Sequence, residues 1–152
     1  MTAGSSIHVT IVEDDEELRE GLGFLIDSTP GTRCGRTYGS VEEALSGIGA
    51  DVPDVMLLDI QLPGLSGSEG VVRFRELWPG MQILMLSVYV ERQKVFESIC
   101  NGASGYLLKT TPPQKVLEAV RDVHAGGSPM SPEIARQVVT LFQKVAPPQR
   151  TD

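Results

Sequence analysis

The sequence predicts an α/β protein with one parallel sheet covered by helices on both faces. Two patterns in its 152 residues lead to this class. Short apolar runs rich in β-branched residues alternate with segments in which apolar residues recur every three to four positions. Most of the apolar runs also end on a polar residue just before a loop. Such alternation is typical of βα units joined by right-handed crossovers.

The first half of the chain contains three of the expected strands. The first strand is expected at residues 7–12, and the helix after it carries an apolar stripe of Leu18, Leu22, Leu25 and Ile26. A weaker strand candidate follows at 33–38. Ser40 with Glu43 forms a capping-box pattern, which predicts the start of a short second helix. The run 55–58 is apolar throughout, as expected for a strand buried on both faces.

The second half supplies two more strands and three more helices. Ser66 with Glu69 predicts the cap of a third helix, which Pro79-Gly80 ends. Strands are expected at 83–86 and 105–108. The helix between them is marked by Val95, Phe96, Ile99 and Cys100, with Gly102 as its stop. Thr111 is expected to cap the fifth helix, with Pro112 in its first turn and a buried stripe of Val116, Val120 and Val123.

The domain organisation expected is one α/β domain over residues 1–127 and a C-terminal helix with a tail over 128–152. Ser131-Pro132 predicts the start of this sixth helix. Its apolar face contains Ile134, Val138, Leu141 and Val145. A packing helix, a dimer element and a mobile stalk are all compatible with this pattern. Residues 146–152 are polar and rich in proline, like a linker.

Composition restricts the partners of the chain. The net charge is −7 and the isoelectric point about 4.8, so phosphate backbones and anionic lipids should repel the chain. No apolar run approaches the roughly 18 residues of a membrane span, and residues 1–6 lack a signal-peptide pattern, so a cytoplasmic location is expected. Cys34 and Cys100 lack metal-ligand spacing and are expected to be reduced.

Polar residues at the strand ends predict a cation site. Glu13 and Asp14 follow the first strand, and Asp59 follows the third. In a parallel sheet the carboxyl ends of the strands share one edge, so these carboxylates should meet there. Repulsion between them is relieved by a hard divalent cation, and Mg²⁺ is expected. Asp14 and Asp59 are the expected direct ligands, and the carbonyl of Gln61 could complete the set.

Two further strand ends bring groups that a purely structural metal site does not need. Ser87 ends the fourth strand and Lys109 ends the fifth. An ammonium group beside a metal is useful when an anion must also be bound. Aspartate carboxylates can accept phosphoryl groups, and a phosphoryl group on Asp59 would bring roughly two negative charges. Lys109 and Ser87 would then bind its oxygens.

The segments that carry these residues resemble the receiver domains of bacterial two-component response regulators. This resemblance implies a flavodoxin-like sheet of order 2-1-3-4-5 and transfer of a phosphoryl group from a histidine kinase to Asp59. It also implies that Ser87 is a switch hydroxyl, Tyr106 a switch aromatic residue and Lys109 the phosphoryl-binding cation. The matching segments, which lie within residues 7–125, are 11–15, 57–64, 86–87 and 102–109.

Three further segments resemble the NarL/FixJ (LuxR-type) subfamily, namely 110–113, 120–127 and 131–133. Proteins of that subfamily carry a C-terminal helix-turn-helix domain for DNA. Residues 126–152 contain few basic groups and no recognition-helix pattern, so this chain is not expected to bind DNA itself. The expected output is transcriptional control through a domain outside this chain, with a homodimer as a possible consequence of phosphorylation.

Two other functions are compatible with parts of the pattern. An Mg²⁺-dependent phosphatase or phosphotransferase would need a second catalytic acid and a substrate cap, and no large insertion supplies them, so the chain is not expected to be an enzyme. A stand-alone receiver or a pseudo-receiver would act as a protein-interaction module. The complete set of strand-end residues argues against a pseudo-receiver. Tyr89 is expected near the mouth of the site, where it could limit the access of water or of a phosphatase, and an ordinary surface aromatic residue is equally compatible with the pattern.

Overall fold

A five-stranded parallel sheet forms the centre of the molecule. The computed structural model describes residues 6–88 and 91–145. The spatial order of the strands is β2-β1-β3-β4-β5, and every neighbouring pair is parallel. The order 2-1-3-4-5 is therefore confirmed. The strands are β1 (Ile7–Val12), β2 (Thr32–Tyr38), β3 (Val55–Leu58), β4 (Gln82–Ser87) and β5 (Gly105–Leu108).

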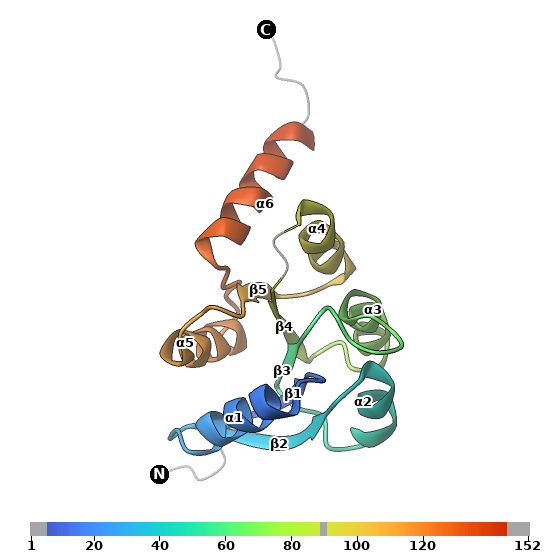
Figure 1. Ribbon diagram of the computed structural model, residues 1–152, viewed down its shortest axis with the longest axis vertical. Coiled ribbons are helices and arrows are strands. Elements are labelled where there is room, and N and C mark those ends of the chain that lie inside the picture. Colours follow the sequence, from blue (N-terminus) through green and yellow to red (C-terminus); the bar gives the residue numbers. More distant parts are fainter. Residues whose placement is uncertain (1–5, 89–90, 146–152) are drawn as a thin grey trace, which may run out of the picture.

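Helices cover both faces of this sheet, as Figure 1 shows. One face packs against α1 and α5, and the other against α2, α3 and α4. A sixth helix follows at the C-terminal end of the described chain. The helices are α1 (Glu16–Asp27), α2 (Val41–Gly47), α3 (Gly67–Leu77), α4 (Arg92–Asn101), α5 (Pro113–His124) and α6 (Pro132–Val145).

Strand β3 shows why the apolar runs in the sequence become central strands. All four of its residues are buried. Successive side chains of a strand point to opposite faces, so Met56 and Leu58 enter the core under α2, α3 and α4. Val55 and Leu57 enter the core under α1 and α5. An uninterrupted apolar run is therefore what a strand with helices on both faces requires.

Most of the predicted helix caps are present. The Ser66 hydroxyl accepts the Glu69 N–H at 3.1 Å, and the Glu69 carboxylate accepts the Ser66 N–H at 3.0 Å, which completes a capping box. Ser40 accepts the N–H of Glu43 at 3.1 Å. Substituting such a cap by alanine typically costs about 1 kcal/mol. These polar side chains define where α2 and α3 begin.

The predicted cap of α5 is wrong. The helix begins at Pro113, Pro112 occupies the N-cap position, and no side chain caps this end. A residue before proline is disfavoured in helical geometry, so Pro112, which precedes Pro113, stays extended with ψ of 149° and takes the N-cap position in place of Thr111. The Thr111 hydroxyl instead lies 3.4 Å from the Ser131 hydroxyl.

Helix α4 is confirmed, but two of the apolar residues that mark it face solvent. Phe96 is 47% exposed and Cys100 is exposed. Ser98 takes the buried position beside Val95, and its hydroxyl donates to the Lys94 carbonyl at 2.9 Å. The polar side chain can be buried because it is hydrogen-bonded within its own helix.

The segment before α6 covers the outer edge of β5. The Tyr106 N–H donates to the Pro129 carbonyl at 3.0 Å, and the Ser131 N–H donates to the Tyr106 carbonyl at 3.1 Å. The Leu108 N–H donates to the Ser131 hydroxyl at 3.0 Å. An exposed strand edge presents unpaired polar groups, and this segment satisfies them. The expected boundary at residues 127 and 128 therefore separates two parts that are hydrogen-bonded to each other.

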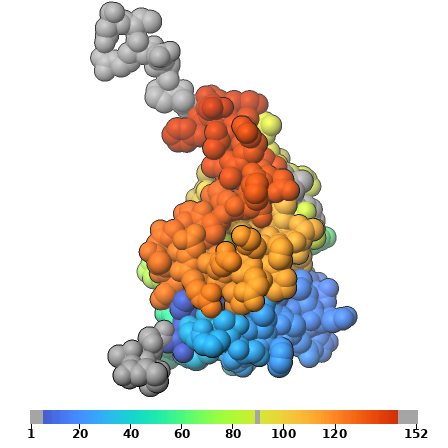
Figure 2. All heavy atoms as spheres, turned by 90° about the vertical axis from the view of Figure 1, so that its left-hand side faces the viewer, coloured from blue at the N-terminus to red at the C-terminus, as the bar shows by residue number. Residues whose placement is uncertain are grey.

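Helix α6 is a packing helix at its start. Ile134 is fully buried, and Val138 packs against the same core as α4. Further along, Phe142 is 70% exposed. Figure 1 shows the second half of the helix extending beyond the sheet, and in Figure 2 this end of the helix protrudes from the body of the molecule. The predicted linker-like tail at 146–152, the Val145 side chain and Tyr89 lie outside the described residues. No helix in the described part of the chain is long and apolar enough to cross a membrane.

Candidate functional site

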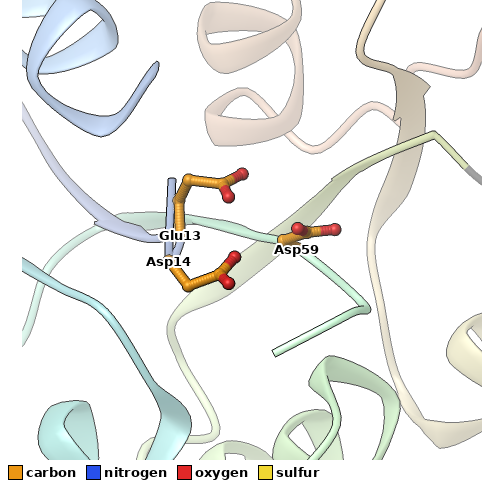
Figure 3. A group of neighbouring side chains, drawn as sticks. All are labelled: Glu13, Asp14 and Asp59. Carbon is orange, nitrogen blue, oxygen red and sulfur yellow. The ribbon is translucent and has the colours of Figure 1, made fainter. Parts of the chain in front are cut away.

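Three carboxylates meet at the carboxyl edge of the sheet, as the strand order predicts. Glu13 and Asp14 follow β1, and Asp59 follows β3 (Figure 3). Each offers a ligand oxygen, and these atoms all lie within 4.8 Å of one another. Glu13 and Asp59 are 3% and 5% exposed, whereas Asp14 is exposed. The site therefore contains two buried carboxylates and one carboxylate that is exposed to solvent.

Lys109 crosses from the end of β5 to these acids. Its Nζ lies 2.7 Å from Oε1 of Glu13 and 3.0 Å from Oδ2 of Asp59. The Lys109 N–H donates to the carbonyl of Ser87 at 2.9 Å, which fixes the residue beside the end of β4. The ammonium group is thus in direct contact with two of the three carboxylates, Glu13 and Asp59.

Burial and charge perturb both ends of this ion pair. Desolvation raises the pKa of Glu13, and the nearby Asp59 charge adds to this, against the lowering effects of Lys109 and of the Asp15 N–H. Desolvation alone would lower the pKa of Lys109, but its hydrogen bonds to Glu13 and Asp59 outweigh that effect and the pKa is raised. The lysine therefore stays charged at neutral pH. Burial of the ionised form of Glu13 costs desolvation free energy.

The backbone around Asp59 is fixed by close contacts. Its N–H donates to the Val12 carbonyl at 3.1 Å, which ties the end of β3 to β1. The Gln61 N–H donates to Oδ1 of Asp59 at 3.3 Å. Gly67 approaches the Asp59 carbonyl so closely that a Cβ at this position would overlap it. The carboxylate consequently has a defined direction, and the Gln61 backbone lies next to it.

The two residues expected to act as a switch lie in the interior. Ser87 and Tyr106 have no exposed surface in the described structure. The Tyr106 ring packs in the core that α4 and the first turns of α6 share, with Val95 and Ile134 among its members. The Tyr106 side chain is therefore fully buried, and it packs in a core that joins β5 to the start of α6.

Two residues that sequence reasoning missed hold the loops of the site. Nη1 of Arg19 donates to the Glu13 carbonyl at 2.7 Å. Oε2 of Glu42 accepts the Leu65 N–H at 2.9 Å, across 23 positions of sequence. Arg19 lies in the first turns of α1, six residues after Glu13, and because Glu13 lies outside the helix no helical spacing relates the two. No local pattern indicates the Glu42 contact, because it depends on how α2 packs beside the loop after β3.

The residues present fit a hard divalent cation. Three carboxylates and one ammonium group leave a net charge of two negative units, which such an ion balances. Mg²⁺ prefers oxygen ligands and usually keeps several waters, which suits a site with one exposed carboxylate. The expected ligands Asp14 and Asp59 supply oxygens from opposite sides of the group, with Glu13 beside them. The Gln61 carbonyl stays a predicted ligand.

Comparison with known proteins assigns the chain to one family. Residues 9–121 match the family model described as the response regulator receiver domain. The chain belongs to this family.

Individual relatives agree with the subfamily expected. The chain is 30% identical over 138 residues to the transcriptional regulatory protein LnrK of Bacillus subtilis, covering 91% of this chain and 63% of LnrK. It is 32% identical over 143 residues to the DNA-binding transcriptional activator DevR/DosR of Mycobacterium tuberculosis, covering 94% and 66% respectively.

A crystal structure of a LuxR-family two-component response regulator from Aurantimonas superposes with a TM-score of 0.84 at 27% identity. That match covers 91% of this chain and 99% of the other. The resemblance to LuxR-type receivers is therefore confirmed. The chain spans less than two thirds of the length of the two curated relatives.

Proposed function

We propose that this chain is a phospho-acceptor switch in which Asp59 receives a phosphoryl group from a sensor histidine kinase in an Mg²⁺-dependent reaction. One observation carries the proposal: Asp59 is buried, its backbone is fixed by hydrogen bonds, its carboxylate contacts an ammonium group, and two further acids lie within 4.8 Å. A carboxylate with these neighbours suits accepting and holding an anion. The protein is then the substrate of the transfer, and it also changes conformation in response to the phosphoryl group.

The chemistry of the transfer follows from the charges at the site. An oxygen of the Asp59 carboxylate attacks phosphorus, a P–O bond forms, and the P–N bond to the donor imidazole breaks. When bound, Mg²⁺ supplies charge neutralisation for the phosphoryl oxygens. Lys109 turns from Glu13 toward a phosphoryl oxygen while it stays charged, and the Ser87 hydroxyl binds another. The residues position the groups and offset charge, which is the main requirement of phosphoryl transfer.

The conformational change at the site is proposed to reach α6 through β5. Lys109 follows Leu108 directly, and the Leu108 N–H is bonded to the Ser131 hydroxyl just before α6. Tyr106 is bonded through both its N–H and its carbonyl to residues 129 and 131. A displacement of Lys109 or Ser87 therefore changes the hydrogen bonds that hold the start of α6 against β5. Phosphorylation shifts the equilibrium only by the difference in its interactions with the two arrangements.

The relatives indicate what such a signal controls. LnrK and DevR/DosR are named as transcriptional regulators, and both extend beyond the region matched here. We infer that in the natural protein this receiver controls a DNA-binding domain through α6, in the cytoplasm, with dimerisation on phosphorylation as one route. The acidic receiver itself is not the DNA-binding part.

Phosphorylation by a small donor tests this function. The protein is incubated with acetyl phosphate with and without Mg²⁺, and its intact mass is measured. We expect one added phosphoryl group, dependent on Mg²⁺ and absent from Asp59→Ala. Asp15→Ala is the control, because Asp15 caps α1 instead of joining the acidic group. Equal uptake by Asp59→Ala would overturn the proposal, and no uptake by the unaltered protein would favour a pure interaction module.

A further inference from the structure

The loop between β3 and α3, residues 59–66, carries the predicted metal ligand Gln61 and is tied to helix α2. Its base is closed by the Gly67 N–H, which donates to the Ile60 carbonyl at 2.7 Å. Leu62 is buried in the core and holds the middle of the loop. The returning half is held by Glu42, whose carboxylate accepts the Leu65 N–H. This Glu42–Leu65 tether lies outside the site that is proposed to bind the cation and the phosphoryl group.

We propose that Glu42 is a positioning residue for Mg²⁺ binding and phosphorylation, acting through the Leu65 N–H on the loop that carries Gln61. This inference rests on the proposed function of the Asp59 site. Glu42 touches neither Asp59 nor the other carboxylates of the acidic group, so its effect is transmitted by the backbone. Its role is to keep the loop in one conformation, so that the carbonyl of Gln61 does not have to be ordered when the ion arrives.

The local backbone shows that the approach of Glu42 is specific. Gly64 adopts φ of 79°, a left-handed conformation that favours glycine. A Cβ at this position would overlap the carboxylate of Glu42. The chain therefore places a residue without a side chain where the carboxylate must come close, and the next N–H points at Oε2 at 2.9 Å. The pairing depends on Glu42 and Gly64 together.

The size of the effect follows from the exposure of the contact. Glu42 is exposed, so water competes for its carboxylate and for the Leu65 N–H. We expect loss of the contact to weaken Mg²⁺ binding about three- to tenfold, the range of one ordinary hydrogen bond at a partly hydrated position. The folded structure persists, since the loop keeps its closed base and the buried Leu62.

Three variants separate positioning from charge and from general stability. Glu42→Ala removes the acceptor, and Glu42→Gln keeps an acceptor oxygen while it removes the charge. Glu43→Ala is the matched control, because Glu43 is also an exposed acid in the first turn of α2 but accepts the Gly39 N–H at 3.1 Å instead. Mg²⁺ affinity is measured by calorimetric titration, and amide hydrogen exchange at Leu65 is measured in the metal-free proteins.

We expect Glu42→Ala to lose Mg²⁺ affinity and to exchange the Leu65 amide faster, while Glu42→Gln and Glu43→Ala stay within about twofold of the unaltered protein. Gly64→Ala, which displaces the same carboxylate from the other side, is expected to reproduce the loss. Unchanged Mg²⁺ affinity in Glu42→Ala would overturn the inference, as would a Gln variant as weak as the Ala variant. If the unaltered protein bound no Mg²⁺, the proposed function itself would fail, and the inference with it.

Discussion

Replacing Lys109 by methionine tests the electrostatic account of the site. The substitution keeps most of the apolar stem and removes an ammonium group at 2.7 Å from Glu13 and 3.0 Å from Asp59. Both carboxylates are left buried without their cation, since their side chains are only 4% and 5% exposed. Removing one partner of a buried ion pair typically destabilises a protein by about 3–5 kcal/mol.

The expected loss is smaller than this range for two reasons. The Lys109 side chain is 19% exposed, so water already screens the pair in part. Glu13 can also take up a proton, since burial raises its pKa. We therefore expect about 2–3 kcal/mol near neutral pH, which corresponds to a urea midpoint lowered by about 1 M for a domain of this size.

Urea unfolding with and without Mg²⁺ measures this loss. We expect the deficit of Lys109→Met to shrink as pH falls below neutral, because the pKa of Glu13 is raised by burial and a protonated Glu13 no longer requires the cation. Added Mg²⁺ is expected to recover much of the deficit at neutral pH by neutralising the same carboxylates. A variant as stable as the unaltered protein near pH 7, or one that Mg²⁺ leaves unchanged, would refute the reasoning.

Three other predictions follow from the same structure. The pKa of Glu13 is raised in the folded protein, so the native state loses stability as pH rises from the unfolded pKa of 4.5 through the folded pKa. In Glu13→Gln without Mg²⁺ we therefore expect stability to fall less steeply above pH 4.5. An unchanged dependence of the urea midpoint on pH would contradict this. Burial, with the charge of Asp27, raises the pKa of Cys34 to about 11, so a thiol reagent should modify the exposed Cys100 first, and equal rates would count against the assignment. Ser131→Ala leaves the buried Leu108 N–H without its acceptor, so we expect about 1–3 kcal/mol lower stability and faster amide exchange in α6, and unchanged exchange there would argue against the route along β5.

The acidic group could be predicted from sequence because it depends on topology more than on detailed packing. Once the apolar runs are assigned to parallel strands, the residues after β1 and β3 must share an edge. Glu13, Asp14 and Asp59 meet there. The length of a lysine side chain then allows Lys109 to reach them from β5, although the structure alone shows that it contacts Glu13 as well as Asp59.

Features that depend on packing between distant segments were not predictable. Thr111 carries a local capping pattern, but consecutive prolines and the contact with Ser131 place it outside α5. The complete burial of Tyr106 depends on residues that arrive with α6. The tether from Glu42 to Leu65 joins helix α2 to the loop after β3, and no periodicity in the sequence encodes their approach. Sequence patterns thus predict the charged residues of the site better than the residues that hold the site's loops in place.

Chemical trapping of the modified residue tests the central claim most directly. An acyl phosphate is reduced by borohydride to an alcohol, which converts a phosphorylated aspartate into homoserine, whereas free carboxylates do not react. After treatment with acetyl phosphate, Mg²⁺ and borohydride, peptide mapping is expected to find homoserine at position 59 and at no other aspartate. Homoserine at Asp14 or Asp15 in place of Asp59, or a stable phosphoryl group on another residue type, would contradict the account.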